Sequence, residues 1–287
     1  MTITQSANEL IAGFERSLAL ADAAPAGPFF AGVDLGTANI VTAVVDAAGT
    51  PVAGVLTRGR SAVRDGLVLD YMGAINILRR QVETLGQAGY NLELASAAYP
   101  PGTTGRNRES FANVLRAVGL EVAGLIDEPS AAALVLGIRE GGVVDVGGGT
   151  TGISVLRDGQ VIHTADEATG GLHMDLVIAG HYKISVEDAE KMKNDPRRQA
   201  EIFPLVRPVF QKMAGIAREH LRGREVKALY LVGGASCFPG LDEVMADETG
   251  LEVFLPCNPL LATPLGIALS CNREARDIAP RRKAALK

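Results

Sequence analysis

Two stretches of the chain share one pattern of apolar and polar positions. From Phe29 the sequence reads FFAGVDLGTANIVTAVVDAAGTPVAGVLTRG, in which short apolar runs rich in β-branched residues are separated by turn residues. This pattern predicts three consecutive strands with turns at residues 34–36 and 48–49. From Gly141 the sequence GGVVDVGGGTTGISVLRDGQVIHTADEAT predicts the same order of strands and turns, with Asp158 and Gly159 in the second turn. The repetition indicates two related lobes.

The remaining segments predict helices and two short strands. Apolar residues recur with helical spacing in residues 74–86, 107–118, 130–136, 173–179, 186–193 and 202–221. Short apolar runs predict strands at residues 94–98 and 229–232. Because strands and helices alternate, we expect an α/β fold in which helices cover the sheets.

The first 28 residues form a separate unit. Residues 6–9, Ser-Ala-Asn-Glu, match a capping box, and a linker rich in Ala, Pro and Gly follows at residues 21–28. Between them lies one apolar stripe, formed by Leu10, Ile11, Phe14 and Leu18. An isolated helix of this length is marginal in water, so we expect the stripe to be covered. Its cover is the protein's own surface, a second copy or another protein.

Composition narrows the class of protein. A chain of 287 residues, 47% of them hydrophobic and 21% charged, is long enough for two folded domains. The net charge of −5 gives no general attraction to nucleic acid or to anionic membranes. No apolar run reaches the ~20 residues of a membrane span, and the first residues do not have the order of a secretion signal. We therefore expect a cytoplasmic protein.

The two predicted turns carry the candidate chemistry. Asp34 places a carboxylate at a strand end, Gly36 lets backbone N–H groups approach an anion, and Thr37 adds a hydroxyl. Asp, Gly and Thr are ordinary turn residues, so a turn of this kind often has no role in binding. The second copy joins Asp145 to the glycines at 147–149, whose ordering costs entropy without adding packing. Two facing turns of this kind would supply N–H donors for phosphate oxygens and carboxylates for the water shell of Mg²⁺.

Five motifs together resemble those of the actin, Hsp70 and hexokinase superfamily. DLGTAN, DEPSAAAL, DVGGGTT, LVGGAS and PLGIAL are similar, in order, to its first phosphate, first connecting, second phosphate, adenosine and second connecting motifs. The resemblance covers about residues 30–270 and implies a two-lobed, actin-like (ribonuclease H-like) ATPase fold with reduced outer subdomains. It places lobe I at residues 29–140 and lobe II at 141–263, followed at 264–287 by a helix that returns to lobe I and a basic tail.

Other segments are most similar to one branch of that superfamily, the ethanolamine-utilisation J family of chaperones. These segments are GTANIV, PVAG, VRDG, YPPGT and GGLHMDLVIAGHYKISVEDAEKMK. The resemblance implies ATP and Mg²⁺ as ligands and a protein partner from the ethanolamine pathway or its bacterial microcompartment. From the net charge we expect no nucleic-acid or membrane partner, and a homo-oligomer stays open. In this context the N-terminal helix could also dock onto microcompartment components.

The resemblance assigns roles to single residues. Asp34 and Asp145 correspond to the carboxylates on the Mg²⁺ side, and Glu128 to the acid that orients or deprotonates the attacking water. For Glu128 the alternative is a helix-start residue that favours the helix dipole. The implied cofactor-binding positions are Gly36, Thr37, Ala38, Asn39, Gly147, Gly148, Gly149, Thr150, Glu190, Lys193, Gly233, Gly234 and Ala235.

Two of these assignments also have plainer explanations. Glu190 and Lys193 match the ribose and adenine contacts, but an acid and a base three positions apart on a helix are also an ordinary surface pair. The glycines of the adenosine motif, Gly233 and Gly234, could simply form a strand-to-helix turn.

Departures from the superfamily pattern modify the expected activity. No lysine precedes Lys183, so the catalytic lysine of Hsp70 lobe I has no counterpart and turnover should be slow. Cys237 stands where Hsp70 proteins stack an arginine on adenine, which removes a cation–π contact. The first hypothesis is a slow Mg-dependent ATPase that acts as a chaperone or assembly factor in ethanolamine utilisation. The alternative is a nucleotide-switched actin-like scaffold with little hydrolysis.

Overall fold

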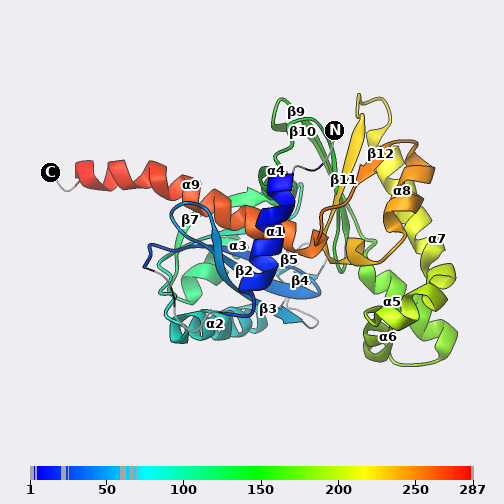
Figure 1. Cartoon of the computed structure of the whole chain (residues 1–287), viewed down its shortest axis with the longest axis horizontal. Helices are drawn as coiled ribbons and strands as arrows, with labels where there is room; N and C mark the ends of the chain where they lie inside the picture. Colours follow the sequence, from blue (N-terminus) through cyan, green and yellow to red (C-terminus); the bar gives the residue numbers. More distant parts are fainter. Residues whose placement is uncertain are drawn as a thin grey trace.

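The chain folds around two five-stranded sheets with the same strand order (Figure 1). In this computed structural model the first sheet has the order β3-β2-β1-β6-β7 and the second the order β10-β9-β8-β11-β12. In each sheet three hairpin strands pair antiparallel and the last two strands add in parallel. The predicted duplication and the α/β class are confirmed.

The structure describes residues 3, 5–20, 24, 26–58, 63–64, 67–68 and 70–285. The strands of the first sheet are β1 (Phe30–Leu35), β2 (Asn39–Val45), β3 (Pro51–Arg58), β6 (Leu94–Tyr99) and β7 (Glu121–Asp127). Those of the second are β8 (Gly141–Val146), β9 (Thr151–Arg157), β10 (Gln160–Glu167), β11 (Ala228–Val232) and β12 (Glu252–Phe254). A small separate hairpin joins β4 (Val63–Arg64) to β5 (Leu67–Val68).

Several helices begin where a side chain caps free backbone N–H groups, at Asp70, Asp127, Ser185 and Asp195. The helices are α1 (Gln5–Ser17), α2 (Tyr71–Gln87), α3 (Gly105–Ala117), α4 (Glu128–Leu136), α5 (Gly171–Tyr182), α6 (Val186–Lys193), α7 (Pro196–Leu221), α8 (Leu241–Thr249) and α9 (Ala262–Ala285). Asp127 accepts a hydrogen bond from the Ser130 N–H and so starts α4. The prediction that one helix begins at residue 202 is wrong, because α7 starts at Pro196 after the capping side chain of Asp195.

Helices α4 and α9 join the two sheets through a shared apolar core. Side chains from α1, β2, α4, β8, β11 and α9 form this cluster between the lobes. Each lobe also has a core of its own, in which helices cover the outer sheet faces. Helix α9 runs from between the lobes along β1 and β2 of the first sheet (Figure 1). The two lobes therefore share one core in which α4 and α9 take part.

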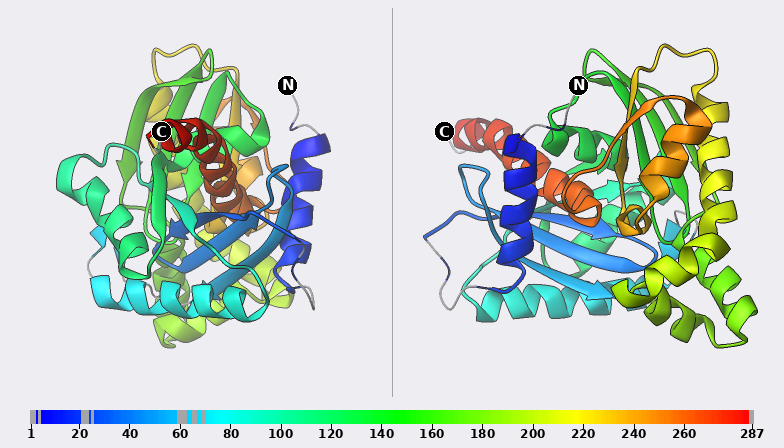
Figure 2. Two further views of the ribbon diagram at one scale, coloured as in Figure 1. Left: turned by 90° about the vertical axis from the view of Figure 1, so that its left-hand side faces the viewer. Right: turned by 45° about the vertical axis from the view of Figure 1, so that its right-hand side comes forward.

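The N-terminal helix α1 packs on the protein itself, beside β3 (Figure 2). Ile11 and Phe14 are fully buried, and the Phe14 ring lies against Gly54 of β3. Two hydrogen bonds join the helix to the loop before α9: Cys257 N–H donates to Asn8 Oδ1 at 3.0 Å, and Asn258 Nδ2 to Glu15 Oε1 at 3.0 Å. The protein's own surface thus covers the apolar stripe.

The predicted start of this helix is wrong. The helix begins at Gln5, so Ser6 lies inside its first turn and does not cap it. Of the predicted linker, residues 21–23 and 25 lie outside the described residues, as do Asp65 and Gly66 of the VRDG segment. The last two residues of the basic tail also lie outside them.

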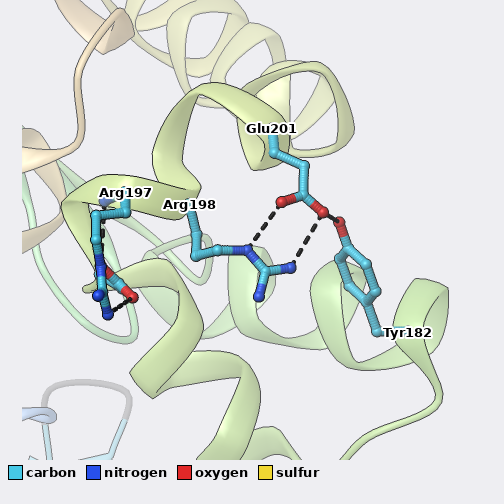
Figure 3. Close-up of polar contacts among 5 residues, drawn as sticks. Tyr182, Arg197, Arg198 and Glu201 are labelled. Atoms are coloured by element: carbon cyan, nitrogen blue, oxygen red, sulfur yellow. Dashed lines mark hydrogen bonds and ion pairs between the residues drawn. The ribbon is translucent and has the colours of Figure 1, made fainter.

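A surface network ties α5 to α7 at the outer edge of lobe II (Figure 3). The Arg198 guanidinium binds both oxygens of Glu201, which also accepts a hydrogen bond from the Tyr182 hydroxyl. The hydrogen bonds from Arg198 and Tyr182 lower the pKa of the Glu201 carboxyl. The network thus holds the end of α5 against the start of α7. In the part of the chain that is described, no helix has the length and apolar character required to cross a membrane.

Candidate functional site

A cavity of about 210 Å³ lies between the two lobes. Its walls come from the β1–β2 turn, the β8–β9 turn, the start of α4, helix α6 and the loop after β11. Every position predicted to act in catalysis, cofactor binding or metal binding lines it: Asp34, Gly36, Thr37, Ala38, Asn39, Glu128, Asp145, Gly147, Gly148, Gly149, Thr150, Glu190, Lys193, Gly233, Gly234 and Ala235. The fold thus brings together five segments that are far apart in the sequence.

The two glycine-containing turns face each other across the cavity. A Cβ atom added to Gly148 would lie 2.7 Å from the Cβ of Ala38, and one added to Gly149 would lie 3.1 Å from the Thr37 Oγ1. Real Cβ atoms do not approach other atoms as closely as 2.7 Å, so a side chain at Gly148 would force the turns apart. Glycine at this position therefore permits the close approach of the two lobes.

The start of α5 fixes the orientation of the second turn. The Gly171 N–H donates to the carbonyl of Gly147 at 2.9 Å, and the Leu172 N–H donates to that of Gly148 at 2.8 Å. In a planar trans peptide the N–H group points opposite to its carbonyl. The N–H groups of Gly148 and Gly149 are therefore turned away from α5, where they can serve as donors to an anion.

Three of the carboxyl groups that line the cavity, those of Asp34, Glu128 and Asp145, influence one another. Burial, with the nearby charge of Asp145, raises the pKa of Asp34 to about 7. Burial also raises the pKa of Asp145 to about 6, although the Thr263 hydroxyl donates to its Oδ2 at 3.1 Å and favours the charged form. The pKa of Glu128 is raised well above its ordinary value by burial and by the charges of Asp145 and Asp34. A cation placed among these groups would stabilise their charged forms.

The carboxylates of the cavity suit an Mg²⁺ ion that is also bound by phosphate. They suit a metal ion held by protein side chains alone less well. Within the described residues, no group of three or more His, Cys, Asp or Glu side chains is arranged to hold a metal ion. Mg²⁺ commonly keeps several waters and is shared between one or two carboxylates and substrate phosphates. Asp34 and Asp145 fit that arrangement, in which the ion would neutralise charge on the phosphate oxygens.

The opposite end of the cavity is formed by α6 and the loop after β11. Gly233 has a φ of +87°, and a Cβ there would lie 2.3 Å from Asp145 Oδ1, so only glycine fits beside this carboxylate. The surface-pair explanation for Lys193 is wrong. Its Nζ lies 2.7 Å from Asp175 Oδ1 and donates to the Gly171 carbonyl at 3.2 Å, and it does not pair with Glu190. Lys193 thus fixes α6 against the start of α5.

Eight lining residues were given no role from the sequence: Leu35, Val41, Arg58, Pro100, Gly171, Asn194, Leu260 and Thr263. Pro100 lies within the YPPGT segment, Asn194 directly follows Lys193, and Thr263 directly precedes the PLGIAL motif. Arg58 belongs to no motif and reaches the cavity from the end of an edge strand.

Comparison with known proteins identifies the family. The family model "MreB/Mbl protein" matches residues 57–194 and "Cell division protein FtsA" matches residues 142–266. Ethanolamine utilization protein EutJ of Escherichia coli K12 is 44% identical over 258 residues, covering 89% of this chain and 91% of that protein. This chain belongs to the EutJ family. EutJ of Salmonella typhimurium is 41% identical over 92% of the chain and 94% of its own length.

Solved structures confirm the two-lobed actin-like fold. EutJ from Carboxydothermus hydrogenoformans, 46% identical, superposes with a TM-score of 0.83 over 93% of this chain and 97% of that one. MreB5 of Spiroplasma citri, whose structure is described as bound to AMPPNP, superposes with a TM-score of 0.72 over 89% of this chain and 99% of that one. At 18% identity the MreB5 comparison shows the fold alone. The EutJ family therefore has the architecture of actin-like ATPases.

Proposed function

We propose that this EutJ family member binds Mg·ATP between its lobes, hydrolyses it slowly and thereby acts as a chaperone or assembly factor in ethanolamine utilisation. One observation carries the proposal: all the residues assigned to phosphate, metal, adenosine and water line one cavity between two facing turns. Backbone N–H groups for phosphate, carboxylates for Mg²⁺ and one further acid for water are the parts that phosphoryl transfer requires.

In the proposed reaction Glu128 positions or deprotonates the water that attacks the terminal phosphate. Its carboxyl belongs to the first residue of α4, and its pKa is raised by burial and by the charges of Asp145 and Asp34. A raised pKa makes a carboxylate a stronger base, and a nearby cation would keep it charged. Glu128 as a mere helix-start residue would leave hydrolysis independent of its charge.

Single-turnover hydrolysis separates these two roles. We expect Glu128→Gln to bind ATP as the parent does but to hydrolyse it ~10²-fold more slowly, a common contribution of one general base. Glu243→Gln, on the exposed face of α8, is the matched control and should hydrolyse at the parent rate. Equal rates for the parent and Glu128→Gln would exclude Glu128 from the reaction.

A second candidate is a nucleotide-switched scaffold with little hydrolysis. It is favoured by the partial matches to the MreB/Mbl and FtsA models and by the lack of any lysine before Lys183. Prolonged incubation of the protein with ATP distinguishes the candidates. Release of phosphate supports the slow ATPase, whereas unchanged ATP with nucleotide-dependent sedimentation supports the scaffold.

The proposed partner is an enzyme or shell component of the ethanolamine microcompartment, met in the cytoplasm. Closure of the lobes on ATP would alter the surface that the partner contacts, which couples nucleotide state to affinity. We expect more of the protein to co-purify with microcompartment shells in Mg·ATP than in nucleotide-free buffer. Equal co-purification in both buffers would argue against nucleotide-controlled binding.

A further inference from the structure

The side chains that line the cavity have an uneven balance of charge. Among the described residues, four acids line it, Asp34, Glu128, Asp145 and Glu190, and two basic residues, Arg58 and Lys193. The Lys193 amine already forms an ion pair with Asp175, and both side chains are nearly buried. An anionic ligand would therefore find little positive charge at Lys193.

Arg58 differs from Lys193 because no side chain among the described residues pairs with its charge. Among the described residues the guanidinium makes no hydrogen bond or ion pair, and the side chain is exposed. By contrast, Arg116, Arg197, Arg198 and Arg218 are each paired with a carboxylate. Arg58 can therefore bind a ligand without first breaking an ion pair to the described part of the chain.

Arg58 stands where lobe I meets the adenosine loop of lobe II. It is the last residue of β3 and pairs in register with Asn39, the first residue after the first phosphate turn. Across the lobes, a Cβ on Gly234 would lie 3.6 Å from the Asn39 Nδ2. The Arg58 charge also acts on Cys237: burial raises the pKa of this thiol, and the nearby Arg58 opposes that rise. Arg58 thus lies between the phosphate turn and the adenosine loop.

We infer that Arg58 binds the phosphate groups of the nucleotide from lobe I. A guanidinium presents donors in a planar fork that matches two phosphate oxygens, and such charge-assisted pairs are among the strongest hydrogen bonds in proteins. The contact would span the cleft, because Arg58 comes from lobe I while the adenosine loop comes from lobe II. This inference rests on the proposed function, since it takes Mg·ATP as the ligand.

Calorimetric titration of Arg58→Gln with ATP, ADP and adenosine, each with Mg²⁺, tests the inference. We expect affinity for ATP and ADP to fall ~10-fold or more, the usual loss when a charged hydrogen bond is removed. Affinity for adenosine should stay unchanged, because adenosine carries no phosphate. Arg58→Lys should keep part of the affinity. Arg80→Gln, an equal change of charge at an exposed position of α2, should leave all three affinities unchanged.

The outcomes separate this inference from the proposed function. Equal binding of ATP by the parent and by Arg58→Gln overturns the inference alone. An equal loss for ATP and adenosine also overturns it, because Arg58 would then contact the base. A parent protein that binds no nucleotide overturns the proposed function together with the inference. If Arg58→Gln has a lower melting temperature without ligand, Arg58→Lys replaces it in the test. A loss of affinity for ATP but not for adenosine in Arg58→Lys then supports the inference, and equal affinities for ATP in the parent and Arg58→Lys overturn it.

Discussion

The first and second phosphate turns occupy equivalent places in their lobes but are built differently. The second turn is a run of glycines whose carbonyls are held by the start of α5. The first turn instead carries the side chains of Thr37, Ala38 and Asn39. The hairpin is therefore the same in both lobes, and the second turn is bare backbone held by the start of α5.

The aspartates that precede these turns differ in the same way. Asp145 accepts a hydrogen bond from Thr263 and has a pKa of about 6, whereas Asp34 lies beside the charge of Asp145 and has a pKa of about 7. Near neutral pH Asp145 is thus the more fully charged of the pair. Lobe II therefore supplies the aspartate held by a hydrogen bond, and lobe I supplies the one with the higher pKa.

The largest expected effect comes from removing either carboxylate. A ligand that binds only the folded state at a hundred times its Kd stabilises it by about 2.7 kcal/mol. We expect Asp34→Asn and Asp145→Asn each to lose the Mg·ATP-dependent rise in melting temperature. Asp247→Asn, at an exposed position of α8, should retain it. A normal rise in both variants would show that these carboxylates do not hold the ion.

A smaller effect is expected from filling the space between the two turns. Because a Cβ at Gly148 would collide with Ala38, Gly148→Ala should hold the lobes apart and weaken Mg·ATP binding ~10-fold, as overpacking costs 1–3 kcal/mol. Gly180→Ala, in α5 and outside the cavity lining, is the matched control, since a Cβ there would meet no neighbour within 4 Å. Equal affinities of the two variants in calorimetry would mean that the turns separate freely.

The raised pKa of Asp34 predicts a pH dependence of stability without ligand. Between the ordinary pKa near 3.8 and the folded value of about 7, the folded state binds more protons at this group than the unfolded state does. Stability contributed by this group therefore falls as pH rises through that window. We expect denaturant unfolding of Asp34→Asn to show a weaker decline across it. An identical pH profile of stability for parent and variant would contradict the raised pKa of Asp34.

The smallest effect should follow from the loss of the Thr263 hydroxyl. Thr263→Val removes the hydrogen bond that favours charged Asp145, so the pKa of Asp145 should rise toward that of Asp34. Affinity for Mg·ATP should then fall near pH ~6.5, where a group with a pKa of about 7 is partly protonated, and match the parent near pH ~8. A loss of equal size at both pH values would indicate a packing defect.

Much of the fold could be predicted because capping residues, turn residues and the spacing of apolar residues mark its helices and strands in the sequence. Helix α6 has the predicted bounds, since Ser185 caps its start and the helix carries the expected periodicity. The two hairpins are marked by their turn residues and apolar strands. Strands β7 and β12 and helix α8 were not predicted: β7 shows no alternation of buried and exposed residues, and β12 has only 3 residues. Their pairing depends on neighbours that lie far away in the sequence.

The residues of the candidate site also differ in how far the sequence could predict them. Residues within motifs could be placed in one site, because glycine and aspartate at turns have recognisable chemistry. Thr263 and Arg58 could not, since each reaches the cavity only through tertiary packing. Thr263 is brought to Asp145 by the start of α9, and Arg58 is brought to the adenosine loop by the approach of the lobes. No local pattern distinguishes these two residues from ordinary surface positions.

Calorimetric titration of the parent protein with ATP, with and without Mg²⁺, tests the central claim most directly. If the two turns jointly hold Mg·ATP, one ATP will bind per chain, binding will weaken without Mg²⁺, and a variant carrying both Asp34→Asn and Asp145→Asn will bind none. Unchanged ATP binding by that double variant, or no binding by the parent, would contradict the account.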